Sequence, residues 1–202
     1  MQHLGLRFGQ ILAAAALLAV SSAPALAGWK LVPAAAPVKV AKSTMSVTPG
    51  EAWNRASHRA SKKGETWTLD GPSLNEVYFA AALLPGETFY KDLRKKEKPL
   101  PVMGKNLALT DIPEFYESSQ RIAYNTSVYE VTGIEPVKFL GQDGVKFSYT
   151  FAVEGNPMQY KGIARATLIK GQLYLISFDA PAINFYERDH AKAETIMESA
   201  RL

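Results

Sequence analysis

Residues 141–178 have the sequence GQDGVKFSYTFAVEGNPMQYKGIARATLIKGQLYLISF, and this stretch decides the fold. Turn-forming residues interrupt it at Gly141–Gly144, at Gly155–Pro157 and at Gly171. Glycine, asparagine and proline favour tight turns, and the β-branched and aromatic residues between them favour strands. The pattern therefore predicts three consecutive antiparallel strands, over Val145–Glu154, Met158–Lys170 and Gln172–Phe178.

The first and last of these strands differ in how apolar residues are distributed between their two faces. In the first, Val145, Phe147 and Tyr149 alternate with polar residues, so one face is buried and the other is at least partly wet. In the last, apolar side chains point both ways, which indicates that both faces of the sheet are covered. Apolar residues at helical spacing over 112–124 and 184–201 supply two helices. The expected fold class is α+β, an antiparallel β-sheet with a helix packed on each face (an α/β/α sandwich).

The N-terminus predicts export. Within residues 1–27, a single charged residue, Arg7, precedes the apolar run Ile11–Val20, and Ala25-Leu26-Ala27 fits the site that a signal peptidase cleaves. Ten apolar residues fall well short of the roughly 20 that span a bilayer. We therefore expect a signal peptide over 1–27, a flexible N-terminal segment over 28–43 and a single α+β domain over 44–202. The mature protein is expected to be periplasmic or secreted, with no transmembrane segment.

Composition narrows the function classes. The chain has no cysteine, which removes disulfides, thiolate nucleophiles and cysteine metal sites. Its net charge is +4, and loss of Arg7 with the signal peptide leaves +3, too small an excess to indicate nucleic-acid binding. Glu187, His190 and Glu194 stand at a spacing that metal ligands use, but an exposed helix flank explains them more simply. We expect no metal, no cofactor and no catalytic residue, and motifs for common nucleophiles and phosphate loops are absent.

The segment 83–107 has no hydrophobic period and contains the charged run Lys91–Lys98. That run carries five positive and two negative side chains. A solvated loop is one interpretation. The other is a docking or lid element, because irregular loops this long in compact domains are usually functional or mobile. Arg94, Lys95 and Lys96 are therefore candidate partner-binding residues, which would meet an acidic protein or anionic lipid headgroups.

Trp53 and His58 are the other candidates. They lie in a polar stretch where a ligand contact is possible, although an indole packed on the sheet edge also explains Trp53. Further on, Glu65–Leu69 and Leu74–Ala82 flank a turn and predict a hairpin. Asp70 opens that turn, and a turn-forming role explains it without catalysis.

The order of elements resembles that of the PsbP-like superfamily of envelope and lumenal proteins. The similarity runs from the strand at Val47-Thr48-Pro49, through the hairpin and the middle helix, to the meander, Phe178-Asp179-Ala180-Pro181 and the last helix. The resemblance implies a noncatalytic binding or accessory protein of the cell envelope, and no functional residue is carried over from it. The alternative is a small-molecule-binding protein or hydrolase that uses a cleft between sheet and helix near Trp53, His58 and Asp70. Partner identity and oligomeric state are left open.

Overall fold

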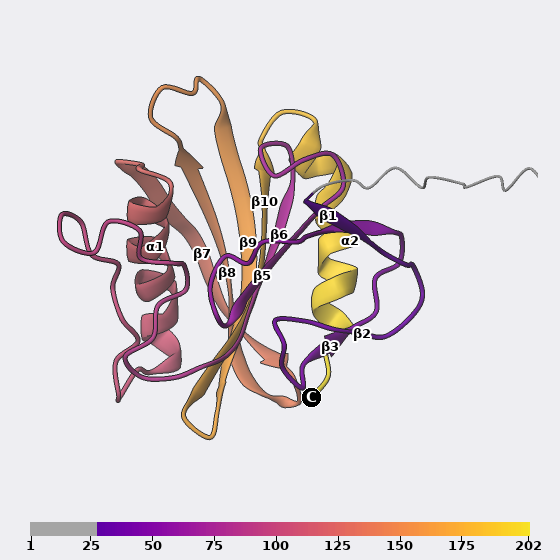
Figure 1. Ribbon diagram of the computed structural model, residues 1–202, viewed down its shortest axis with the longest axis horizontal. Coiled ribbons are helices and arrows are strands. Elements are labelled where there is room, and N and C mark those ends of the chain that lie inside the picture. The colour runs from indigo at the N-terminus through magenta and orange to yellow at the C-terminus, as the bar shows by residue number, and fades with distance from the viewer. Residues whose placement is uncertain (1–27) are drawn as a thin grey trace, which may run out of the picture.

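The computed structural model describes residues 28–202 (Figure 1). Its two α-helices are α1 (Ile112–Ala123) and α2 (Phe185–Glu198), and a short 3-10 helix, η1 (Leu109–Asp111), leads into α1. Its strands, in chain order, are β1 (Trp29–Val32), β2 (Val38–Lys39), β3 (Ser46–Val47), β4 (Trp53–Ala56), β5 (Gly64–Thr68), β6 (Glu76–Leu83), β7 (Val128–Phe139), β8 (Gln142–Ala152), β9 (Gln159–Ile169) and β10 (Gln172–Pro181).

Eight strands form one antiparallel sheet in the order β1-β4-β5-β6-β10-β9-β8-β7, and β2 pairs with β3 separately. The predicted meander is β8, β9 and β10, and the predicted hairpin is β5 and β6. The prediction of a large antiparallel sheet with two helices, an α+β fold, is confirmed. The greater part of β7, over 128–135, was not predicted from the sequence.

Alternate residues of the central strands serve two separate cores. On β6, Val77 and Phe79 pack with α2, whereas Tyr78 and Ala80 pack with α1. Figure 1 shows the two helices on opposite sides of the sheet. Successive side chains of a strand point to opposite faces of the sheet, so a strand that supplies both cores has nearly every residue buried. Nearly all residues of β6 and β10 are buried.

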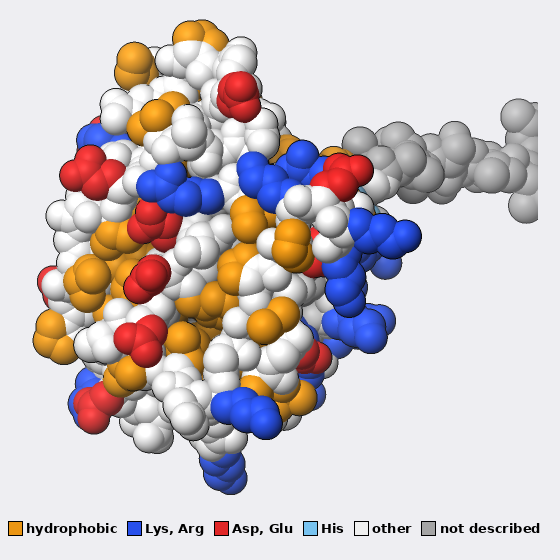
Figure 2. Space-filling model, turned by 90° about the vertical axis from the view of Figure 1, so that its left-hand side faces the viewer, with side chains coloured by type: hydrophobic (Ala, Val, Ile, Leu, Met, Phe, Trp, Pro, Cys, Tyr) orange, Lys and Arg blue, Asp and Glu red, His pale blue; other side chains and the backbone are white. Residues whose placement is uncertain are grey.

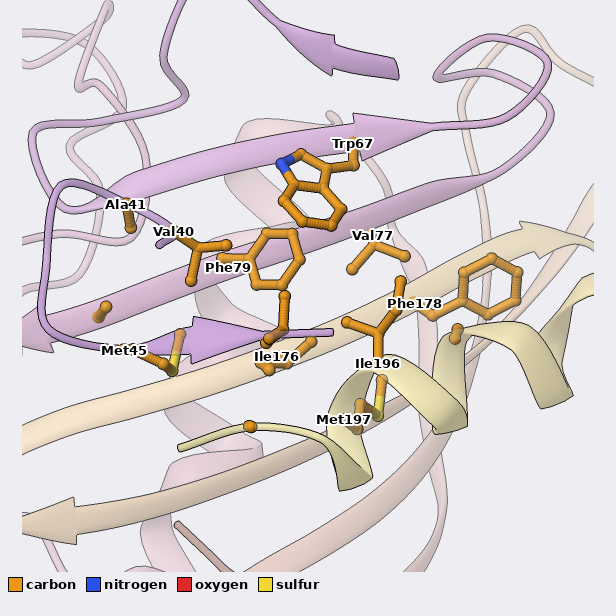
Figure 3. Packing of buried hydrophobic residues seen from close by; sticks show 14 of the residues in the cluster. Val40, Ala41, Met45, Trp67, Val77, Phe79, Ile176, Phe178, Ile196 and Met197 are labelled. Atoms are coloured by element: carbon orange, nitrogen blue, oxygen red, sulfur yellow. The ribbon is translucent and has the colours of Figure 1, made fainter. Parts of the chain in front are cut away.

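The core on the α2 side is mainly aliphatic. In Figure 3, Phe79 and Ile176 from the sheet point towards Ile196 and Met197 of α2. Trp67 stacks at a tilt on Phe79 with ring centroids 4.7 Å apart. All five side chains are essentially inaccessible to water, so this side is a closed, well-packed scaffold.

The segment over 28–43, expected from the sequence to be flexible, contains two short strands, β1 and β2. β1 pairs with β4 along the sheet edge, and Val32 and Val40 are buried in the α2-side core. The strands that pair with this segment come later in the chain, so its local sequence, rich in prolines and alanines, does not reveal the pairing. The expected signal peptide over 1–27 lies outside the described residues.

The segment between β6 and η1 has neither helix nor strand, as predicted. It is nevertheless anchored, because Phe89 and Met103 are buried in the α1-side core and Leu100 is also buried. The charged run Lys91–Lys98 lies between Phe89 and Leu100 and is mostly exposed. Within residues 28–202, no helix is both long and apolar enough to span a membrane.

Candidate functional site

A surface groove of about 500 Å³ lies on the α1 side of the sheet. Three segments far apart in the sequence form its walls: the loop after β4, the charged run, and the last turn of α1. The backbone N–H of Lys91 donates to the carbonyl of Ala60 at 2.7 Å, which joins the first two walls. The Arg94 guanidinium donates to the carbonyl of Ile122 at 3.4 Å and joins the second to the third.

Glu76, the first residue of β6, lies at the floor of this groove. Its side chain is largely buried, and the Tyr124 hydroxyl donates to its carboxyl oxygen at 3.2 Å. Asp179 of β10 is its direct partner across the sheet. Loss of hydration raises the pKa of Glu76 to about 7, and the pKa of Asp179 is also raised, first by burial and then by the charge of Glu76.

A layer of tyrosines surrounds this pair of carboxyl groups. The Tyr149 hydroxyl lies 3.4 Å from Asp179, and Tyr116 bonds Ser177 at 2.7 Å. Tyr129 stacks on Tyr149 with ring centroids 5.2 Å apart. Burial raises the pKa of these tyrosines, so the hydroxyls stay protonated and act as hydrogen-bond donors and acceptors.

The rim of the groove is cationic. Arg59, Lys91, Arg94 and Lys98 line it, and no ion pair involves any of the four in the described chain. Asp92 is the carboxylate in the wall, and it accepts the backbone N–H of Leu100 at 3.2 Å. Figure 2 shows this side of the molecule, with apolar side chains between charged ones and Lys and Arg gathered towards the right-hand margin.

Among the residues predicted to bind a partner, His58 and Arg94 meet at the groove. Lys95 and Lys96 stand on the exposed run beside it and line a shallower depression with Arg94. Trp53 does not take part. It is fully buried in β4 as part of the α2-side core, so its prediction as a partner-binding residue is wrong. Its large apolar area is used for packing, the alternative that the sequence left open.

The catalytic cleft proposed as an alternative near Trp53, His58 and Asp70 is not formed by the described residues. His58 lines the groove, Asp70 lines a different pocket, and Trp53 is buried. Asp70 instead accepts a hydrogen bond from Asn75 at 2.8 Å and pairs with Arg188 of α2. It therefore ties the β5–β6 turn to α2.

The residues with metal-ligand spacing on α2 have other partners. Glu187 lies 3.3 Å from Lys161, and Glu194 lies 2.9 Å from Lys146. The His190 ring stacks on Tyr186 and bonds its backbone carbonyl at 3.1 Å. Over 28–202, no group of three or more His, Cys, Asp and Glu is arranged to hold a metal ion.

Sequence reasoning missed Glu76 and Asp179. A signal existed, since Glu76 and Asp179 are each charged residues at an end of a strand that is otherwise almost entirely apolar. Glu76 and Asp179 are paired because β6 lies beside β10 in the sheet. The pattern of residues within each strand does not predict this strand order.

The sequence matches no family model and no curated protein. Solved structures are similar to it at low identity. A cyanobacterial PsbP from Synechocystis sp. PCC 6803 shares 16% identity over 86% of this chain and 81% of that chain, with a TM-score of 0.42. LpqN, involved in cell envelope biogenesis of Mycobacterium tuberculosis, shares 10% over 86% and 78%, with a TM-score of 0.35.

A third similar structure is the Ran-binding protein Mog1p of Saccharomyces cerevisiae, at 11% identity over 85% of this chain and 94% of that chain, with a TM-score of 0.41. A PsbP is thus among the similar structures, and PsbP-like proteins are the group that the order of elements in the sequence resembles. Since all three TM-scores are below 0.5, the function is argued from the residues of this chain.

Proposed function

We propose that this chain is an exported, noncatalytic binding or accessory protein of the cell envelope, built as a PsbP-like α/β/α sandwich. It docks an acidic surface, of a protein or of a lipid membrane, through one side of the molecule. We name that side the cationic surface and define it by eight bases: Arg59, Lys62, Lys63, Lys91, Arg94, Lys95, Lys96 and Lys98.

The observation that carries this proposal is the difference in ion pairing around the molecule. Bases near α2 are neutralised, as in the pairs Arg165 with Glu198 at 3.0 Å and Lys192 with Asp189 at 3.1 Å. No ion pair in the described chain involves a base of the cationic surface. Unpaired bases close together repel one another and create a positive potential. An acidic partner is attracted by that potential, since no carboxylate of this chain neutralises the bases.

Two further features support docking at this surface. The bases share pockets, since Lys62, Lys63, Lys91 and Lys95 line one depression beside the groove. Leu93, at the centre of the charged run, is 87% exposed, which places an apolar side chain among the bases. An exposed leucine surrounded by lysines fits an anionic interface, where each base contributes about 1 kcal/mol.

The test compares two triple variants of equal charge change. Arg94→Ala with Lys95→Ala and Lys96→Ala removes bases of the cationic surface, whereas Lys30→Ala with Lys39→Ala and Lys138→Ala removes bases elsewhere. Cosedimentation with phosphatidylglycerol vesicles and capture from an envelope extract are measured at low and high salt. We expect the first variant to lose on the order of a hundredfold in affinity in at least one assay, because three contacts of about 1 kcal/mol each are removed.

The control variant is expected to bind like the wild type. Vesicle binding that depends on these bases identifies a lipid partner, and capture without vesicle binding identifies a protein. Unchanged binding of the first variant in both assays, or an equal loss in both variants, contradicts the proposal.

A further inference from the structure

We infer that the groove above Glu76 is a binding site for a small amphiphile with one anionic head group and an apolar body. This inference concerns the interior of the groove, whose four rim bases, Arg59, Lys91, Arg94 and Lys98, also belong to the cationic surface. It follows from three zones of the groove that differ in chemistry.

The rim supplies the charge that an anionic head group needs. Arg59, Lys91, Arg94 and Lys98 converge on it from two segments, against the single wall carboxylate of Asp92. Arg94 and Lys98 are also positioned, because they donate to Ile122 and Asn125 at the end of α1, each at 3.4 Å. Guanidinium and ammonium groups held in place bind carboxylates and phosphates through charge-assisted hydrogen bonds.

The walls below the rim are apolar. Tyr90, Leu100, Ile122 and Tyr124 line them, and the Tyr90 and Tyr124 rings meet edge to face with centroids 6.2 Å apart. Ligand pockets are lined mainly by apolar and aromatic groups, with few polar groups that set orientation, and their volumes run from about 300 to 1,000 Å³. A fully polar anion such as free phosphate leaves these walls uncovered, so an apolar body is required.

The floor carries at most one negative charge, against four bases at the rim. Glu76 is 9% exposed, accepts a hydrogen bond from Tyr124 and is paired across the sheet with buried Asp179. Two adjacent carboxyl groups in a buried site do not both ionise at neutral pH, and the Tyr124 hydroxyl beside them is neutral. The head group is therefore attracted to the rim, and the apolar body lies between the apolar walls.

The test is isothermal titration of the full chain with four probes: dodecanoate, dodecyl phosphate, neutral octyl glucoside and inorganic phosphate, each below its micelle concentration. Dodecanoate and dodecyl phosphate are expected to bind at least tenfold more tightly than octyl glucoside and inorganic phosphate. Which of the two anions binds better distinguishes a carboxylate from a phosphate ligand. Absence of binding by both, or equal binding of octyl glucoside, overturns the inference.

Variants separate the groove from general charge. Lys98→Ala removes a rim base and Lys96→Ala removes a base of the same run that does not line the groove. Ala123→Trp fills the groove from an exposed position on α1 without changing any charge. Lys98→Ala and Ala123→Trp are expected to weaken dodecanoate binding at least fivefold, with Lys96→Ala unchanged. Equal effects of Lys98→Ala and Lys96→Ala, or no effect of Ala123→Trp, contradict the site.

Failure of this site is distinguishable from failure of the docking function. Lys96→Ala belongs to the docking surface alone, and Ala123→Trp belongs to the groove alone. Vesicle binding that survives Ala123→Trp while dodecanoate binding is lost supports both proposals. Absence of binding of both dodecanoate and dodecyl phosphate by the wild type overturns the groove only.

Discussion

The two sides of the sheet are built from alternate residues of the same strands, yet they differ in chemistry. The α2 side holds one buried tyrosine, Tyr174, in an otherwise largely aliphatic core. The α1 side buries five, Tyr78, Tyr116, Tyr129, Tyr149 and Tyr160, beside the carboxyl groups of Glu76 and Asp179. Both sides bury carboxyl groups, but on the α2 side Glu65 and Asp189 are paired with Arg55 and Arg188, whereas no ion pair in the described chain involves Glu76 or Asp179.

The surfaces follow the same division. Ion pairs neutralise the bases around α2, whereas the cationic surface faces solvent unpaired. One face of the sheet therefore serves as scaffold, and the other carries the groove and its charges.

The largest effect is expected in the α2-side core. Phe79→Ala removes a fully buried ring that packs against Trp67 and α2. We expect the free energy of unfolding to fall by about 3–5 kcal/mol, as for other buried aromatic truncations. Urea denaturation measures it, and the loss should be the same at pH 5 and pH 8 because no titrating group is involved. A loss below about 1 kcal/mol would show that this side is not the scaffold.

The next effect belongs to Glu76 and depends on pH. Its folded-state pKa of about 7 lies above its ordinary value of 4.5, so the folded protein holds a proton that the unfolded chain releases in that window. The contribution of Glu76 to the free energy of unfolding is therefore fully present below pH 4.5. It is lost as the pH rises towards 7, and the loss is on the order of 3 kcal/mol.

Glu76→Gln keeps the acceptor for Tyr124 and removes this ionisation. We expect the variant and the wild type to be equally stable at pH 4, and the variant to be more stable at pH 8, by the same order of 3 kcal/mol. Denaturant titrations across this range measure the difference. Parallel pH profiles would mean that Glu76 ionises normally and that the floor of the groove is charged.

A smaller effect is expected where β9 passes under the tyrosine layer. A Cβ atom added to Gly162 meets the ring of Tyr149, whereas one added to Gly133 of β7 meets nothing within 4 Å. Gly162→Ala should therefore cost about 1–3 kcal/mol through overpacking, with displacement of the Tyr149 ring. Gly133→Ala is the matched control and should be neutral or nearly so. Equal stability of both variants would mean that the tyrosine layer is loosely packed.

The smallest effect on stability is expected at the cationic surface. The triple variant of Arg94, Lys95 and Lys96 to Ala should change the free energy of unfolding by less than about 0.5 kcal/mol, because exposed side chains without partners contribute little. Removing mutual repulsion should make any change slightly favourable. Thermal unfolding in low salt measures it. A large loss of stability would assign these bases a structural role and remove them from the docking surface.

Local patterns predicted much of the scaffold. These patterns act on residues close to them in the sequence. Examples are the turns at Gly141–Gly144 and Gly155–Pro157 and the alternation of apolar and polar residues around Phe147. The strand β1 was missed because its pairing partner, β4, is distant in the sequence. The charged run was found because its charge is local. Glu76 was not, because its pKa is raised by burial, and the segments that bury it are distant in the sequence.

The central claim is that the α1 side of the sheet carries the docking surface and the α2 side is scaffold. Hydrogen–deuterium exchange of the full chain, with and without phosphatidylglycerol vesicles, tests this claim most directly. Binding at the cationic surface protects backbone amides in 58–63 and in 91–98 and leaves those of α2 unchanged. That is the predicted result. Protection confined to α2 and the β9–β10 side, with 58–63 and 91–98 exchanging as in the free protein, would contradict the account.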